Sequence, residues 1–347
     1  MEGANSGPPN TRIAVVTGGN KGIGFEVCRQ LASGGVTVVL TARDETRGTA
    51  AVEKLKGLGI SGVVFHQLDI TNASSIAGLA DFLKTRFGKL DILESFSFPS
   101  VNNAAIGGVE YLQELDTNEE KFSGLDFHQR LEWMFTNINE TVDGSKEGVK
   151  TDYYGTKHVI EALLPLLQSS SDGRLVNVSS DAGLLTASSD VPVMLYSDAP
   201  KFPPYPTFIV TVFLLIHVYV QFIKNEEVRQ ELNDIDNLTE QRIDELLDKF
   251  LEDFEAGTSE AQGWPTVLAA YKMAKAAMNA YSRILAKRHP ELRVNCVHPG
   301  YVRTDITMGS GILTPEEGAR NVVKVALLPE GSPTGLYFDK GEEASFV

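Results

Sequence analysis

A glycine-rich run near the start of the chain has the residue types and spacing of a phosphate-binding loop. Thr17-Gly-Gly-Asn-Lys-Gly-Ile-Gly24 follows the β-branched run Ile13 to Val16 and precedes a helical pattern. Glycines let the backbone approach a pyrophosphate, and the amino end of a helix offers free N–H groups and a positive dipole to an anion. Because the run lies between an expected strand and an expected helix, it predicts a dinucleotide site, whereas an isolated glycine pattern could be a plain turn.

A tyrosine and a lysine farther along the chain could transfer a proton. Tyr271 and Lys275 stand four positions apart in a helix expected over Val267–His289, so they share one helix face. A nearby ammonium stabilises a phenolate and lowers the phenol pKa from its usual value of about 10. Tyr271 could then donate a proton to a carbonyl oxygen as hydride reaches the carbon, and accept it in the reverse direction. The alternative is that both residues are merely helix surface.

A serine pair follows the strand that is expected at Arg174 to Val178. A hydroxyl at the end of this strand could hold and polarise the oxygen that Tyr271 protonates. From their position alone, Ser179 and Ser180 are both candidates.

The order and spacing of these motifs resemble the short-chain dehydrogenase/reductase family over nearly the whole chain. The resemblance is carried by TGxxxGxG at 17–24, Asn102-Asn103-Ala104-Ala105, Asn177-Val-Ser-Ser180, Tyr271-Lys-Met-Ala-Lys275 and Pro299-Gly-Tyr-Val-Arg-Thr304. The segments TARD, FHQLDI and GWP are typical of its monomeric carbonyl reductases. The plant branch of that group includes neomenthol dehydrogenases, menthone reductases and salutaridine reductase.

The resemblance implies a doubly wound parallel α/β sheet of the Rossmann type and gives roles to individual residues. It implies that Ser180, the second serine of the pair, contacts the substrate oxygen and that Lys275 also hydrogen-bonds the nicotinamide ribose. Asp69 stands where family members contact the adenine ring. The expected cofactor contacts are Thr17, Gly18, Asn20, Lys21, Gly22, Ile23, Gly24, Arg43, Asp69, Ile70, Asn103, Ala104, Lys275, Pro299, Gly300, Val302 and Thr304.

The charge of two residues favours one form of the cofactor. An acidic residue that binds a ribose 2′-hydroxyl is expected at the end of the second strand, but that segment reads Thr41-Ala42-Arg43. Lys21 adds a second cation inside the glycine run, and two cations suit a 2′-phosphate. We therefore predict NADP(H) rather than NAD(H). The alternative is that Arg43 is a solvated residue at the strand end.

One position departs from the family pattern. Thr151-Asp152-Tyr-Tyr-Gly-Thr156 is similar to a family segment in which asparagine holds a water of the proton relay. Asp152 cannot donate hydrogen bonds as an amide does unless it is protonated, and its ionised form would help to keep Lys275 protonated. We expect Asp152 to belong to the catalytic group and to slow turnover.

The interval between Ser180 and Tyr271, 91 positions, is longer than in most of the family. The carbonyl-reductase branch uses such an insertion, here 181–262, as a helical lid over the active site, which can make a dimer unnecessary. Thr239 to Phe254 fits the lid, because Thr239 can cap a helix. Its apolar residues form one helical stripe, which consists of Ile243, Leu246, Leu247, Phe250, Leu251 and Phe254. An ordinary solvated helix with a core-facing stripe would show the same pattern.

Two stretches interrupt the regular pattern, Glu94–Ser100 and Thr186–Gln221. The hypothesis is that both are retained intron sequence or an error of the gene model. The apolar run Phe208–Ile223 has 16 residues. As a helix it would span roughly 24 Å, short of the ~30 Å hydrocarbon core, so a membrane span is the less favoured interpretation.

The elements that must position these residues alternate along the chain, which indicates a parallel, doubly wound sheet. Strands are expected at Ile13 to Val16, Val36 to Thr41, Val63 to Leu68, Leu90 to Leu93, Arg174 to Val178 and Arg293 to Val297. Helices are expected after the glycine run and over Thr46 to Leu58, Ile76 to Phe87, Tyr154 to Leu167 and Val267–His289. Thr314-Pro315-Glu316-Glu317 has the capping box that opens another helix.

The composition narrows the class of protein. The 347 residues carry a formal net charge of −15, which argues against a nucleic-acid or anionic-membrane partner. We expect a single domain in which 1–11 form a disordered tail without signal-peptide features. Cys28 and Cys296 are expected to be buried free thiols, which is consistent with the cytoplasm. The six histidines lack metal-ligand spacing, so no metal is expected.

The sequence therefore predicts a monomeric enzyme that reduces a carbonyl group on a hydrophobic small molecule, such as a monoterpenoid or alkaloid ketone, with NADPH. The reaction would be reversible and would use Ser180, Tyr271 and Lys275. An alternative is a protein that binds NADP(H) but is catalytically weak, because of the two stretches and Asp152. A membrane-tethered reductase, held by Phe208–Ile223, is a third hypothesis.

Overall fold

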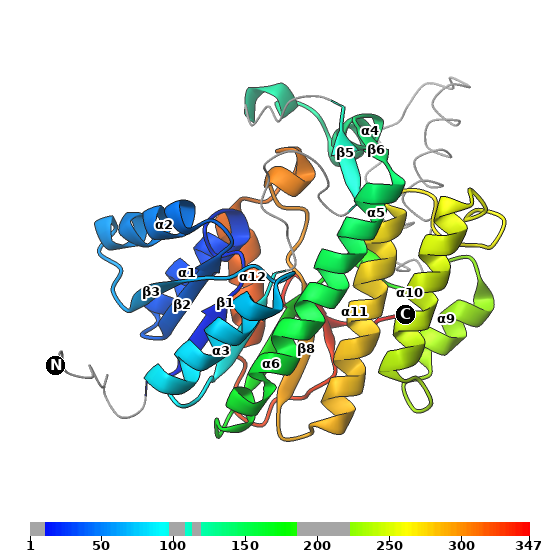
Figure 1. Ribbon diagram of the computed structural model, residues 1–347. Coiled ribbons are helices and arrows are strands. Elements are labelled where there is room, and N and C mark those ends of the chain that lie inside the picture. Colours follow the sequence, from blue (N-terminus) through cyan, green and yellow to red (C-terminus); the bar gives the residue numbers. More distant parts are fainter. Residues whose placement is uncertain (1–10, 97–107, 113–118, 186–222) are drawn as a thin grey trace.

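An eight-stranded sheet forms the centre of the molecule (Figure 1). The computed structural model describes residues 11–96, 108–112, 119–185 and 223–347. The strands of the sheet are β1 (Ile13–Val16), β2 (Thr37–Ala42), β3 (Val63–Gln67), β4 (Ile92–Ser95), β7 (Arg174–Val178), β8 (Arg293–His298), β9 (Tyr337–Asp339) and β10 (Glu342–Ala344). Their order is β10-β9-β8-β7-β4-β1-β2-β3, and all neighbours run parallel except β9 and β10.

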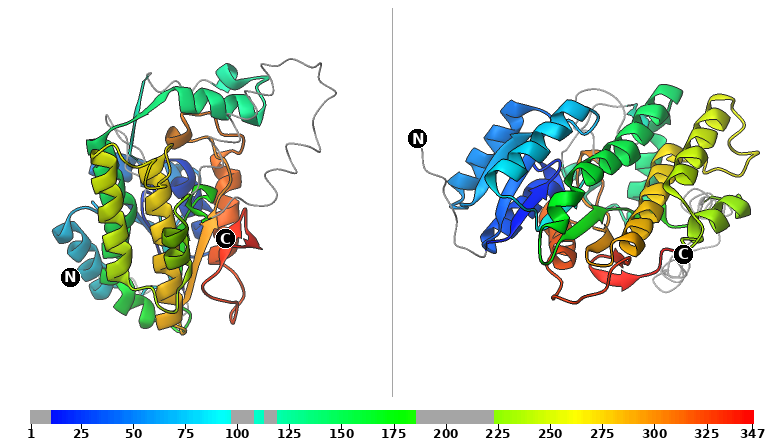
Figure 2. Two further views of the ribbon diagram at one scale, coloured as in Figure 1. Left: turned by 90° about the vertical axis from the view of Figure 1, so that its right-hand side faces the viewer. Right: turned by 60° about the horizontal axis from the view of Figure 1, so that its bottom comes forward.

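Helices cover both faces of this sheet (Figures 1 and 2). One face carries α1 (Gly22–Ser33), α2 (Glu45–Gly57) and α12 (Pro315–Ala326), and the other carries α3 (Ala73–Arg86), α6 (Thr156–Gln168) and α11 (Ala269–Arg288). Each face has its own buried apolar cluster. The predicted α/β fold with a doubly wound, mostly parallel sheet is therefore confirmed.

The order of the strands reverses at β1, which lies between β2 and β4. Parallel sheets of this kind bind ligands in the crevice beyond the carboxyl ends of their strands at such a point. The glycine run follows β1 and the serine pair follows β7, so both lie at this edge of the sheet. The fold thus brings two of the predicted motifs to one crevice.

The helix expected from Thr239 forms α10 (Glu240–Glu255), and the Thr239 side chain accepts a hydrogen bond from Arg242 N at 3.1 Å as its N-cap. Together with α9 (Glu226–Asn233), α10 packs on the outer side of α11 (Figure 1). Four residues of its apolar stripe are buried, and Leu251 and Phe254 are partly buried against the same cluster. Asp244 accepts hydrogen bonds from Lys157 Nζ and from the Tyr153 hydroxyl, each at 2.9 Å. Buried apolar contacts and the hydrogen bonds of Asp244 together hold this helix against α6 and α11.

Several elements were not predicted. A small antiparallel pair, β5 (Val109–Tyr111) and β6 (Ile138–Glu140), lies beside α4 (Phe127–Thr136). Strands of three residues contain too few positions to show an alternating pattern. The expected helix at Tyr154 is also longer, because α5 (Val142–Val149) and a π-helix (Lys150–Gly155) run into α6 without a break.

The fourth strand is the main correction to the expected elements. It was predicted to stop at Leu93, but β4 continues through Glu94 and Ser95. Glu94 pairs in register with Val16 of β1 and Val176 of β7. Of the irregular stretch Glu94–Ser100 the structure describes the first three residues, and the first two of these belong to the sheet.

Other expectations fall on residues outside the described ranges. These are Asn103 and Ala104, the stretch Thr186–Gln221, nearly all of Phe208–Ile223 and nearly all of the tail at 1–11. Among the helices that are described, none combines the length and the apolar composition of a membrane span. Within the same described ranges, His, Cys, Asp and Glu side chains form no group that could hold a metal ion.

Candidate active site

The glycine run forms the turn between β1 and α1. Gly18 and Gly22 have φ values of 64° and 55°, in the left-handed region that favours glycine. At Gly24 a Cβ atom would stand 2.5 Å from the carbonyl oxygen of Gly18, so the helix can approach the turn this closely only with glycine there. The N-cap residue Lys21 makes no side-chain cap, which leaves the amino end of α1 open to an anion.

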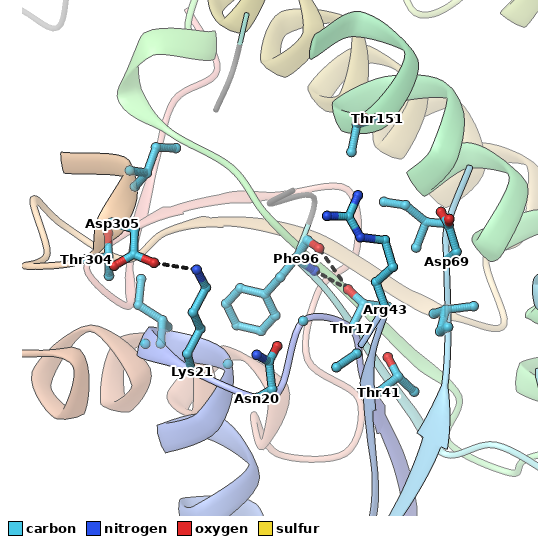
Figure 3. A pocket seen from close by; sticks show the side chains of 18 of the residues that line it. Thr17, Asn20, Lys21, Thr41, Arg43, Asp69, Phe96, Thr151, Thr304 and Asp305 are labelled. Carbon is cyan, nitrogen blue, oxygen red and sulfur yellow. Dashed lines mark hydrogen bonds and ion pairs between the residues drawn. The ribbon is translucent and has the colours of Figure 1, made fainter. Parts of the chain in front are cut away.

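A pocket of about 330 Å³ opens directly over this loop (Figure 3). Its walls are the glycine loop, the end of β2 at Thr41–Arg43, the segment Leu68–Thr71 and the segment Arg303–Ile306. Predicted cofactor contacts that line it are Thr17, Gly18, Asn20, Lys21, Gly22, Ile23, Gly24, Arg43, Asp69, Ile70 and Thr304. We call the part of the crevice around Arg43 and Asp69 the adenosine end.

The two predicted cations lie differently in this pocket. Arg43 extends over the pocket on the same side as Asp69, whereas Lys21 points to Asp305 on the opposite wall (Figure 3). Lys21 Nζ and Asp305 Oδ2 form an ion pair that joins the glycine loop to the segment after β8. The two predicted cations therefore point to different walls of the pocket (Figure 3), and the contribution of Lys21 to binding a 2′-phosphate stays a prediction.

The predicted catalytic residues meet beyond β7, and we call this part of the crevice the reactive end. The Ser180 side chain hydrogen-bonds the Tyr271 phenol and also donates to Asp181 Oδ1 at 3.0 Å. Lys275 is fully buried, its Nζ donates to the carbonyl of Val178 at 3.0 Å, and it lies 5.5 Å from the centre of the Tyr271 ring. The i, i+4 spacing on α11 thus brings phenol and ammonium together at the end of β7.

The geometry also separates the two serines of the pair. Ser179 Oγ donates to Asn279 Oδ1 at 2.7 Å and is buried between β7 and α11. Of the two serines, Ser180 is the one whose side chain hydrogen-bonds the phenol of Tyr271. Of the alternatives left open by position, the structure therefore favours Ser180.

The electrostatics of the reactive end differ from the expected tuning by lysine. Burial is the main cause that raises the pKa of the Tyr271 phenol, and the charges of Asp152 and Asp181 raise it further. Burial also lowers the pKa of Lys275, although the charge of Asp152 raises it. The expected lowering of the phenol pKa is thus not found here, because desolvation disfavours both charged forms.

Asp152 lies on the π-helix, a type of irregularity that often occurs at functional sites. Its side chain is 1% exposed, and neither carboxylate oxygen has a hydrogen bond to a residue in the described part of the chain. Burial raises the pKa of Asp152 to about 7, while the charge of Lys275 lowers it. As expected from the sequence, the carboxylate acts electrostatically on Lys275.

Glu140 is a residue of the site that sequence reasoning missed. Its Oε1 accepts a hydrogen bond from Ala269 N at 2.6 Å, at the amino end of α11 and two residues before Tyr271. Burial raises its pKa to about 7, and backbone hydrogen bonds at this helix end lower it. The partners are 129 positions apart, so no local signal could have linked them.

Comparison with known families then decides the class of protein. The family described as short chain dehydrogenase matches residues 12–193, and the family described as Enoyl-(Acyl carrier protein) reductase matches residues 256–333. The chain belongs to the short-chain dehydrogenase family. It is therefore an oxidoreductase, and the predicted family membership is confirmed.

Individual relatives are similar over almost the whole chain. Salutaridine reductase of Papaver bracteatum is 42% identical over 97% of this chain and 98% of its own. (+)-Neomenthol dehydrogenase of Arabidopsis thaliana is 42% identical over 96% and 98%, and carbonyl reductase [NADPH] 1 of Mus musculus is 35% identical over 91% of each chain. The solved structure of salutaridine reductase from Papaver somniferum superposes with a TM-score of 0.76 at 41% identity, covering 94% of this chain and 99% of that one.

Proposed function

We propose that this protein reduces a ketone on a hydrophobic small molecule, of the monoterpenoid or alkaloid kind, with NADPH, and oxidises the alcohol in reverse. The observation that carries the proposal is the meeting of Ser180, Tyr271 and Lys275 beside a glycine-loop pocket. The relatives named salutaridine reductase and neomenthol dehydrogenase support the direction of chemistry and the substrate class.

The residues of the pocket fit a phosphorylated dinucleotide. The open amino end of α1 suits a pyrophosphate, and Arg43 at the end of β2 suits a 2′-phosphate where an acidic side chain would repel one. When it is bound, NADPH supplies the hydride. The mouse relative named carbonyl reductase [NADPH] 1 supports the same choice of cofactor.

The chain itself supplies the proton and the orientation. Ser180 donates a hydrogen bond to the carbonyl oxygen and fixes it against Tyr271, whose phenol gives that oxygen its proton. Lys275, whose Nζ lies 5.5 Å from the centre of the Tyr271 ring, would hold the ribose next to the nicotinamide. Glu140 fixes the amino end of α11 and so keeps Tyr271 in place.

We also propose that the protein works as a single-domain monomer in the cytoplasm. The helices α9 and α10 already cover the outer side of α11, a face that another subunit would otherwise have to cover. Cys28 and Cys296 are both free and buried, which is consistent with a reducing compartment. Size-exclusion chromatography with light scattering tests the monomer, and cell fractionation tests the location.

The test of the activity is a panel of monoterpenoid, alkaloid and simple aromatic ketones, each mixed with the full chain and NADPH or NADH. We expect cofactor oxidation that is faster with NADPH and that disappears in Tyr271→Phe. Equal rates with both cofactors would contradict the role of Arg43. Activity that survives in Tyr271→Phe would contradict the mechanism.

A second candidate function is a protein that binds NADP(H) but turns over slowly. The observation that favours it is the pair of buried carboxylates near the crevice, Glu94 and Asp152, which make no hydrogen bond within the described part of the chain. Cofactor binding without oxidation of any ketone, in the chain and in the variants described below, would support this candidate.

A further inference from the structure

Phe96 lies at the point of the sheet where a dinucleotide has to cross it. It follows β4 directly, and β4 adjoins β1, where the order of strands reverses. A cofactor that joins the adenosine end to the reactive end must pass over the carboxyl end of this strand. The side chain at this position therefore lies on the path that a bound cofactor must take from the adenosine end to the reactive end.

The contacts of Phe96 hold it on the glycine loop. Its N donates to Thr17 Oγ1 at 2.7 Å, and Thr17 Oγ1 donates to its carbonyl at 2.9 Å. A Cβ atom built on Gly18 would lie 3.8 Å from Phe96 Cβ, which is ordinary contact distance. Figure 3 shows the ring directed to the side where Lys21 lies, away from Arg43.

The ring is packed and not loosely exposed. Phe96 is 3% exposed and belongs to the same buried apolar cluster as Ile23 of α1 and Val302 after β8. Both residues are predicted cofactor contacts, so the ring lies among side chains that should touch the cofactor. Leaving this position would expose an aromatic side chain to water, which is unfavourable, so the ring stays where it is packed.

Phe96 is one of the side chains that line the pocket, together with the segment Arg303–Ile306. Phe96 and the glycine loop line the pocket, whereas Ser180, Tyr271 and Lys275 do not, although all three are described. Among the described residues, the lining of this pocket therefore includes the adenosine end and the glycine loop but not the proton donor.

We propose that Phe96 fills most of the nicotinamide end of the dinucleotide pocket, so that the chain binds the 2′-phosphoadenosine half of NADPH but brings its reactive ring to Tyr271 in only a small fraction of complexes, which makes cofactor oxidation slow. The proposal rests on the proposed function, because it takes the pocket to be an NADP(H) site. It adds a residue that limits which part of the cofactor is bound.

The sequence around Phe96 provides a variant that tests this idea without leaving a cavity. Removal of Glu94–Ser100 joins Leu93 to Val101. Counting along the strand then puts Val101 at the place of Glu94, Asn102 at that of Ser95 and Asn103 at that of Phe96. The shortened strand would carry an apolar residue in the sheet and a short polar side chain on the glycine loop.

The experiment compares the affinities of adenosine 2′,5′-bisphosphate and NADPH by calorimetry on the full chain. For the unchanged chain we expect the two affinities to agree within about threefold, because the nicotinamide half adds nothing. In Phe96→Ala and in the deletion of Glu94–Ser100, we expect NADPH to bind at least about tenfold more tightly while the bisphosphate is unchanged. Phe25→Ala is the matched control, since Phe25 is in the same cluster but does not line the pocket.

The outcomes separate this proposal from the proposed function. NADPH that binds the unchanged chain far more tightly than the bisphosphate would overturn the proposal, as would an unaltered ratio in Phe96→Ala. The single substitution keeps the test decisive if the deletion variant fails to fold. A raised NADPH affinity without turnover of any ketone would uphold the role of Phe96 and contradict the reductase.

Discussion

The adenosine end and the reactive end of the crevice differ in how their polar groups are matched. At the adenosine end, Asp69 Oδ1 accepts hydrogen bonds from Thr71 N and Oγ1 at 2.9 and 2.7 Å, and Asp69 N donates to Ser75 Oγ at 2.9 Å. At the reactive end and beside it, the carboxylates of Asp152 and Glu94 are buried and have no hydrogen bond to any described residue.

This difference shows where the molecule holds unfavourable free energy. A buried polar group without a partner costs about 1–3 kcal/mol, and a charged one costs more. The adenosine end is therefore preformed, while the region around β4 and the π-helix is destabilised by its own carboxylates.

The largest effect should come from the phenol at the reactive end. In the background that lacks Glu94–Ser100, Tyr271→Phe should lower kcat at least about a hundredfold, because a positioned proton donor contributes that much. The affinity for NADPH should stay nearly constant, since the substitution removes one hydroxyl group. Steady-state kinetics and calorimetry measure the two quantities. Tyr281→Phe, on the same helix, is the control, and an equal loss of kcat there would contradict the assignment.

The second prediction concerns Glu94, which is fully buried in the sheet between β1 and β7. Glu94→Leu should raise the free energy of unfolding by about 1–3 kcal/mol, because an apolar side chain of similar size replaces an unmatched carboxyl. Urea unfolding of the full chain measures this. A leucine variant that is no more stable than the unchanged chain would show that Glu94 has a partner outside the described ranges.

Glu94 should also make the free energy of unfolding depend on pH, and the direction of that dependence follows from its pKa. Burial raises the pKa of Glu94 well above its usual 4.5, so the folded state keeps the proton that the unfolded state releases. The free energy of unfolding should therefore be highest below that usual value and fall as pH rises above it. Glu94→Leu and Glu94→Gln should both lose this slope, but only the leucine variant should also gain stability.

The sequence predicted best those parts of the molecule whose pattern is local. Thr239 and the stripe from Ile243 to Phe254 predicted α10 to within one residue, because a capping side chain and a helical period are visible in a short window. The same holds for the glycine loop, which depends on adjacent residues and a flanking strand. Tyr271 and Lys275 were also correctly expected to share one face of a helix.

What the sequence could not predict depends on distant partners. The Lys21–Asp305 ion pair joins residues 284 positions apart, and β4 takes up Glu94 only because β1 and β7 offer it hydrogen bonds on both sides. Favourable sheet pairing here outweighs the poor strand preference of a buried carboxylate. The phenol pKa was wrongly expected to fall, since the burial of Tyr271 and Lys275 is a property of the folded state alone.

The third prediction removes the charge of Asp152. Because Asp152 raises the phenol pKa, Asp152→Asn should lower it and make Tyr271 a better acid, with kcat for reduction rising by up to roughly tenfold. Reduction requires the protonated phenol, so the alkaline limb of the kcat profile should move to lower pH. Thr151→Ser, at the neighbouring position, is the control. An unmoved alkaline limb in Asp152→Asn would contradict the coupling.

Asp152 should also make the stability of the folded state depend on pH. Burial raises its pKa from 3.8 to about 7, so the folded state should lose stability as pH rises through that interval. Asp152→Asn should flatten the free energy of unfolding over the same interval. This effect should add to that of Glu94 if the two sites do not contact each other, and the double variant measures the coupling.

The smallest effect is expected at the wall of the preformed end. Asp305→Asn breaks the pair with Lys21 and frees a cation over the glycine loop, so adenosine 2′,5′-bisphosphate should bind more tightly. Both side chains are about one-third exposed, and exposed pairs are weak, so the gain should not exceed about fivefold. It should shrink as salt is added, because screening weakens the attraction between the freed ammonium and the phosphates. Glu53→Gln, which breaks the Lys56 pair on α2, is the matched control. A gain that persists at high salt would mean that Asp305 narrows the pocket sterically and does not compete for Lys21.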